Sequence, residues 1–82
     1  MKITVLIFSI LRDLAKAESI DVEVENETPL VKDVIGIVYE RFPDIGAWDG
    51  RLLIALNGEY AERETAVKSG DELALMPPVQ GG

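Results

Sequence analysis

The sequence contains no cysteine and no histidine among its 82 residues. Without a thiol or an imidazole, the chain offers no thiol nucleophile, no ordinary imidazole base and no good set of zinc ligands. Disulfides are excluded too, so a single domain of this length must rely on one modest hydrophobic core. The hydrophobic content of 48% is enough for such a core and argues against disorder.

The sequence also lacks the motifs of an autonomous enzyme. No serine lies in a nucleophile-elbow or phosphate-loop pattern. Glu59, Glu62 and Glu64 could be imagined as paired catalytic carboxylates, but they occupy a charged turn, where a solvated face is expected. We therefore assign no catalytic residue and no metal ligand.

Long hydrophobic runs are missing as well. Residues 3–11 are apolar but too short to cross a bilayer, and Arg12 and Asp13 follow at once, so we expect a cytoplasmic protein. The net charge is −7, from 15 acidic and 8 basic residues. Nucleic acid and anionic membranes would be repelled by this charge, and neither is an expected partner.

The chain ends in the run Pro-Pro-Val-Gln-Gly-Gly, residues 77–82. Pro77 and Pro78 fix φ and remove two backbone donors, so the strand before them cannot continue and the tail points away. From Pro78 onward the tail reaches roughly 16–18 Å when extended. Gly81 and Gly82 suit a narrow channel because no Cβ intervenes. We predict a domain over residues 1–76 and an extended tail over residues 77–82; the plain alternative is a loose terminus.

The first half of the chain predicts two strands and a short turn between them. Residues 2–9 alternate with both faces apolar near the end, which favours a central strand or one whose second face, with Leu6 and Phe8, meets a partner. Residues 10–17 predict a helical turn or loop. Residues 20–25 alternate apolar and acidic positions, typical of a half-buried edge strand antiparallel to the first.

The clearest local element is a helix. Thr28 can cap it, Pro29 fits its first position, apolar residues recur at helical spacing up to Phe42, and Pro43 marks its end. Gly36 lies inside it and costs about 1 kcal/mol relative to alanine, which would be explained if the helix backbone packed closely on the sheet.

The second half predicts three more strands. Residues 44–51 predict a loop with Trp48 as a core anchor. Residues 52–56 form a strand, and Asn57-Gly58 is a strong hairpin signal leading into residues 59–61. A polar connection with Val67 buried, and a turn at residues 69–71, then lead into the last strand, which ends at residue 76.

This order of elements fits an α+β fold with one helix lying across a mixed sheet. If the first and last strands pair in parallel at its centre, Leu6 and Phe8 would lie beside Ala74 and Met76 on the face away from the helix. An apolar patch would then adjoin the root of the tail.

With these elements assembled, the chain resembles the ubiquitin-like sulfur carriers of β-grasp fold, and most closely the MoaD family, the small subunits of molybdopterin synthase. The resemblance covers essentially the whole length. It rests on Phe8 with the following Arg12-Asp13-Leu14, on residues 52–59 and on residues 70–82, where Pro-Pro-Val-x-Gly-Gly is the most specific part. Met76 stands where an aromatic residue is frequent in the family.

The resemblance implies a carrier whose Gly82 carboxylate is adenylated by a separate, ubiquitin-activating-like adenylyltransferase that uses ATP. A sulfur donor protein then allows conversion to a thiocarboxylate. It implies that the tail enters the large subunit of molybdopterin synthase, in an expected heterotetramer, and gives sulfur to cyclic pyranopterin monophosphate to form the dithiolene of molybdopterin. No stably bound cofactor is implied.

On the same resemblance, Gly82 carries the sulfur, and threading depends on Gly81, Val79, Pro78 and Pro77. Docking is assigned to Phe8, Arg12 and Met76. Three alternatives stay open: a sulfur carrier for thiamine synthesis, a protein modifier or tRNA-thiolation carrier of the same fold, and a β-grasp interaction module whose tail is never activated.

Overall fold

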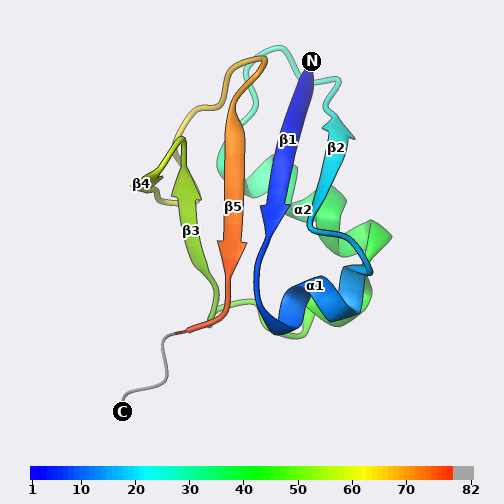
Figure 1. Cartoon of the computed structure of the whole chain (residues 1–82). Coiled ribbons are helices and arrows are strands. Elements are labelled where there is room, and N and C mark those ends of the chain that lie inside the picture. Colours follow the sequence, from blue (N-terminus) through cyan, green and yellow to red (C-terminus); the bar gives the residue numbers. More distant parts are fainter. Residues whose placement is uncertain (79–82) are drawn as a thin grey trace.

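Five strands form one mixed sheet in the order β2-β1-β5-β3-β4 in this computed structural model, which describes residues 1–78 (Figure 1). The elements are β1 (Lys2–Ile7), α1 (Ile10–Ala15), β2 (Ser19–Glu23), α2 (Val31–Arg41), α3 (Pro43–Gly46), β3 (Leu53–Leu56), β4 (Glu59–Tyr60) and β5 (Glu72–Met76). The central strands β1 and β5 are parallel, and the other neighbouring pairs are antiparallel. The predicted α+β β-grasp architecture, with β2 at an edge and β1 beside β5, is confirmed.

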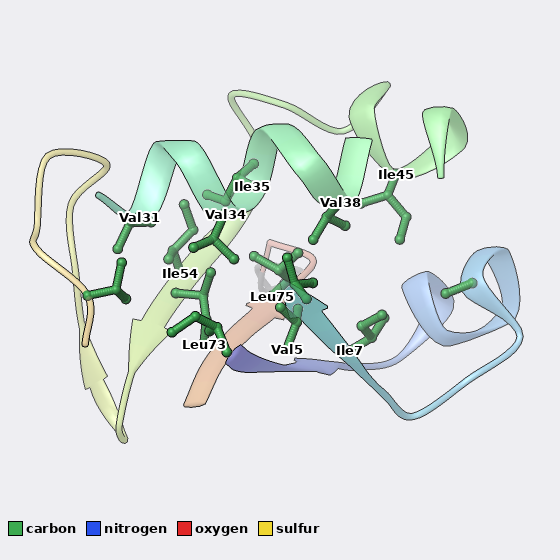
Figure 2. Close-up of a cluster of buried hydrophobic side chains, with 14 of the residues drawn as sticks. Val5, Ile7, Val31, Val34, Ile35, Val38, Ile45, Ile54, Leu73 and Leu75 are labelled. Carbon is green, nitrogen blue, oxygen red and sulfur yellow. The ribbon is translucent and has the colours of Figure 1, made fainter. Parts of the chain in front are cut away.

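Strand alternation divides the sheet into a core face and an open face. On the core face, Ile3, Val5 and Ile7 of β1 and Leu73 and Leu75 of β5 are buried. Helix α2 covers this face with Val31, Val34 and Val38, whose side chains point toward the sheet (Figure 2). Burial of side chains of this size contributes roughly 1.5–3 kcal/mol each relative to exposure. The core therefore lies on the face of the sheet that α2 covers, and the alternate residues of β1 and β5 point to the opposite face.

Helix α2 begins later than the sequence predicted, at Val31. The prediction that Thr28 caps the helix and Pro29 is its first residue is wrong, because the backbone of residues 29–30 is hydrogen-bonded to another segment of the chain. Leu30 forms an antiparallel bridge with Ala66, and the Pro29 carbonyl accepts a hydrogen bond from the Val67 amide at 3.0 Å. Long-range pairing thus holds residues 29–30 extended and delays the helix.

The end of α2 agrees with the prediction, but the following loop contains a short helix. The helix ends at Arg41, and Pro43 opens α3 at a position where its missing amide hydrogen is not needed. Trp48 is partly buried against the core, as predicted, and the Arg51 guanidinium lies 4.6 Å from its ring centroid. The close packing proposed for Gly36 is wrong, because a Cβ built there meets nothing within 4 Å.

The hairpin predicted at Asn57-Gly58 is confirmed, with φ of 52° and 88° at its two turn residues. Two positive φ values are the signature of the tight turn that matches strand twist. The Asn57 side chain also ties the turn to β5, since its amide oxygen accepts from the Glu72 amide and its amide nitrogen donates to Asp71, both at 3.0 Å. These bonds hold the turn against the start of β5, and the turn itself places β4 antiparallel to β3. No helix within residues 1–78 is long and apolar enough to span a membrane.

Candidate functional site

An apolar groove of about 430 Å³ lies on the open face of the sheet. Its position follows from register, because Leu6 of β1 is paired with Ala74 of β5, and Ala74 with Ala55 of β3. Residues paired in this way share one face. The residues lining the groove are Leu6, Phe8, Ala55, Gly58, Tyr60, Glu72, Ala74 and Met76.

The groove is hollow because small residues lie between large ones. Ala55 and Ala74 face one another across β3 and β5 and leave a depression in the middle of the face. Phe8 on the β1 side is 44% exposed, and Tyr60 on the β4 side is 78% exposed. Exposed aromatic side chains beside an apolar hollow are typical of a protein-binding surface rather than of a solvated face.

Phe8 keeps its place beside β5 although β1 ends at Ile7. Its amide donates to the Leu75 carbonyl at 3.2 Å, which extends the parallel pairing by one residue. The chain then turns at Ser9, with φ of 57°, and enters α1. Phe8 and Met76, predicted from sequence as docking residues, are therefore brought together in the groove.

Arg12, the third predicted docking residue, lies outside the groove lining. It sits on α1 with its side chain 49% exposed, and its guanidinium is 3.4 Å from the Glu18 carboxylate. Among the described residues that line the groove, Glu72 carries the one charged side chain. The groove is thus suited to apolar contact, and the structure does not bring Arg12 together with Phe8 and Met76 in its lining.

The tail starts at the end of β5, where pairing stops. Met76 is paired with Leu53 in the last register position, and the half-buried Pro77 and Pro78 follow (Figure 1). The stop agrees with the loss of backbone donors at the two prolines. The predicted functional residues Val79, Gly81 and Gly82 lie outside the described residues. The described part of the chain places the tail's root directly beside Met76 of the groove.

A polar network on another part of the molecule was not visible in the sequence. The Tyr39 hydroxyl donates to Asp49 at 2.6 Å, and Arg63 contacts the same carboxylate oxygen at 2.7 Å. Burial and the bond to Asp49 raise the pKa of Tyr39 to about 12. The bond from Tyr39, with the charge of Arg63, lowers the pKa of Asp49.

This network joins α2, the segment before β3 and the connection between β4 and β5. None of its members lines the groove, so we read it as a structural brace. Within residues 1–78, no cluster of three or more acidic side chains is arranged to hold a metal ion. The open face therefore provides an apolar surface suited to binding.

Sequence reasoning missed Tyr60 and Ala55 as groove residues. The signal was present, because a two-residue hairpin at Asn57-Gly58 fixes Tyr60 opposite Ala55. The position of Ala55 beside Ala74 additionally requires knowing that β3 pairs with β5.

Comparison with known proteins gives a consistent set of relatives. The model of the ThiS family matches residues 5–82. The molybdopterin synthase sulfur carrier subunit of Haemophilus influenzae is 33% identical over 81 residues, covering 98% of this chain and 99% of that protein. Among solved structures, SAMP1 from Haloferax volcanii superposes with a TM-score of 0.89 at 28% identity, covering 100% of both chains. The complex of subunits 1 and 2 of the molybdopterin-converting factor from Helicobacter pylori contains a chain with a TM-score of 0.71 and 26% identity, again covering 100% of both.

Proposed function

The chain belongs to the ThiS family, and from this premise we propose that it is the sulfur carrier subunit of a molybdopterin synthase. The observation that carries the proposal is that the apolar groove is lined by Met76, the residue that directly precedes the Pro-Pro-Val-Gln-Gly-Gly run of the sequence. The relative from Haemophilus influenzae that bears this name matches nearly the whole chain. The carrier is not an enzyme on its own but one subunit of a complex.

The chemistry begins at the carboxylate of Gly82. A free carboxylate is a poor acyl donor, and the sequence has no phosphate-binding loop with which to activate it. A separate adenylyltransferase therefore joins the carboxylate to the AMP part of ATP and releases pyrophosphate. A donor protein then supplies sulfur at the oxidation level of hydrosulfide, which attacks the carbonyl carbon, displaces AMP and leaves a thiocarboxylate. ATP is a substrate of the partner rather than a cofactor of this chain.

Delivery of the sulfur requires the tail to enter a partner's site. The large subunit supplies the substrate site and the catalytic residues, and cyclic pyranopterin monophosphate accepts the sulfur to form the dithiolene. Gly81 allows close approach of the backbone, while Val79, Pro78 and Pro77 set the direction of the tail. A heterotetramer of two carriers and two large subunits, located in the cytoplasm, is the assembly we propose.

Docking of the large subunit is assigned to the groove. Phe8, Met76 and Tyr60 supply apolar area, and Arg12 can pair with an acidic group at the periphery. The solved Helicobacter pylori complex, in which a structural neighbour of this chain is bound to its second subunit, supports a large subunit as the partner. Aromatic residues beside a desolvated hollow are the usual source of binding energy in such interfaces.

The decisive measurement is the mass of the carrier purified from cells that overproduce its activating enzyme. A gain equal to one oxygen replaced by sulfur, localised to Gly82, supports the carrier. Lys68 is the last basic residue, so trypsin leaves residues 69–82 as one peptide, and fragment ions must place the change beyond Met76. An unmodified terminus, with the activating enzyme shown to work, refutes the carrier and favours an interaction module.

Removing Gly82 separates the role of the terminus from that of the fold. The shortened chain should keep its thermal transition and its affinity for the large subunit but lose sulfur transfer. A chain extended by one alanine beyond Gly82 serves as the control, because it keeps every residue and moves only the carboxylate. Retained transfer in either variant would refute the assignment of Gly82.

A protein modifier is the second candidate, because SAMP1, a small archaeal modifier protein, has the TM-score of 0.89. In that function the activated Gly82 carbonyl forms an amide bond with a lysine amine of another protein. Tryptic peptides from the same cells should then contain lysines bearing the residue 69–82 segment. Their absence, together with a thiocarboxylate at Gly82, favours the sulfur carrier.

A further inference from the structure

The chain contains two sulfur atoms, those of Met1 and Met76, and no cysteine. They lie in different surroundings. Met1 packs against the core, while its ammonium group donates to the Val24 carbonyl at 3.0 Å. Met76 lines the groove on the open face, paired with Leu53 at the end of the β3–β5 register. Met76 is therefore the one methionine whose sulfur belongs to the docking surface.

A thioether at such a position is open to a defined reaction. A peroxide transfers one oxygen atom to the sulfur; its O–O bond breaks, the sulfur loses two electrons, and water or an alcohol leaves. The product is methionine sulfoxide, which the methionine sulfoxide reductases return to methionine with electrons from a thiol. Because the chain has no thiol, no cysteine of its own competes for the peroxide.

The sulfoxide changes the groove more than the fold. It replaces an apolar, flexible side-chain end by a strong hydrogen-bond acceptor. Among the described residues lining the groove, Tyr60 carries the one side-chain hydroxyl, and it belongs to β4, two strands away from β5. Two strand spacings are roughly 9–10 Å, so Tyr60 would have to reach across β3 to donate to the new acceptor.

We propose that Met76 is a reversible oxidation site, and that its sulfoxide releases the carrier from partners that bind through the groove. Water satisfies the sulfoxide in the free carrier, but docking would strip that water away and leave the acceptor without a donor. Since the core face of β5 holds Leu73 and Leu75, the fold does not depend on the groove side of Met76. The consequence for docking rests on the function proposed above.

The test uses the full chain in its carboxylate form, so that no thiocarboxylate sulfur is present to react. The carrier is treated with hydrogen peroxide, and its affinity for the large subunit is measured by calorimetric titration before treatment, after treatment and after repair by the reductases. Met76→Leu is the matched control, because it keeps the apolar volume and leaves Met1 as the only oxidisable sulfur. Adding oxygen and replacing oxygen by sulfur change the mass almost equally, so fragment ions of the residue 69–82 peptide must place the oxygen on Met76.

We expect oxidation at Met76 to weaken binding by roughly tenfold or more. The reductases should restore it, the Met76→Leu carrier should bind equally well with and without peroxide, and the thermal transition should move little. Unchanged affinity of a carrier mapped as oxidised at Met76, alongside lost affinity in Phe8→Asp, would overturn the switch while leaving the docking function intact. If the untreated carrier does not bind the large subunit, the docking function itself is refuted, and the switch falls with it.

Discussion

Replacing Gly36 by alanine should stabilise the protein, although glycine at a helix centre is often assumed to be required for packing. Gly36 occupies the middle of α2, which spans Val31–Arg41, and it is exposed. A Cβ added there meets nothing within 4 Å, and its backbone φ is not in the left-handed region. The substitution therefore adds no clash and creates no strain.

The size of the gain follows from helix propensity. Alanine is favoured over glycine in a helix interior by about 0.8–1 kcal/mol, mainly because glycine loses more backbone freedom on folding. For a domain of this size, 1 kcal/mol corresponds to a rise of roughly 4–8 °C in the thermal midpoint. Urea unfolding should show a higher midpoint with an unchanged slope, since the exposed surface is the same.

Gly70→Ala is the matched control, because it makes the same chemical change at a position with a φ of +88° and equally open space. There the Cβ is disfavoured by the backbone, and a loss of roughly 1–2 kcal/mol is expected. Neither residue lines the groove, so binding of the large subunit should be unchanged in both variants. An unfolding free energy that Gly36→Ala leaves unchanged or lowers would refute the reasoning.

Three further predictions follow from single contacts. Asp33→Ala removes the carboxylate that accepts the Leu30 amide at 2.8 Å at the start of α2, and should cost about 1 kcal/mol in urea unfolding; an unchanged midpoint would contradict the cap. Tyr39→Phe removes the hydroxyl bonded to Asp49 and should cost about 1 kcal/mol. The folded-state pKa of Tyr39, raised to about 12, means that the stability it contributes is present below pH 10 and lost as the pH rises toward 12. An ultraviolet titration of Tyr60→Phe, in which Tyr39 is the remaining tyrosine, checks this, and an ordinary midpoint near pH 10 would contradict it. Tyr60→Ala should weaken large-subunit binding by roughly tenfold without changing stability, and equal affinity would remove Tyr60 from the interface.

The elements that the sequence predicted correctly depend on local pattern. Alternation in β1 and β5 and the Asn57-Gly58 turn carry their own periodicity and turn chemistry, and all three are where they were expected. The start of α2 could not be found in this way. Pro29 and Leu30 have good helix-start residues around them, but their backbone groups pair with a segment more than thirty residues away in the chain, at Ala66 and Val67.

The functional-site residues also differ in whether a local sequence pattern predicts them. The position of Phe8 beside Met76 was predicted from the alternation of side chains along each strand and from the assumption that the first and last strands are neighbours. The network of Tyr39, Asp49 and Arg63 has no such pattern, since its three members come from separate segments and meet only in the folded chain. Tyr60 lies between these cases, because its place depends on one hairpin register that the sequence does specify.

In β5, side chains alternate between the core and the groove, so the residues that stabilise the fold differ from those that line the binding surface. Leu73 and Leu75 are fully buried against α2, whereas Ala74 and Met76 line the groove and have no part in the core cluster. A substitution at Leu75 is therefore expected to lower the free energy of unfolding, whereas a substitution at Ala74 changes the shape of the groove. Met76 both lines the groove and directly precedes Pro77 and Pro78, so a partner that docks at the groove also lies next to the point where β5 ends.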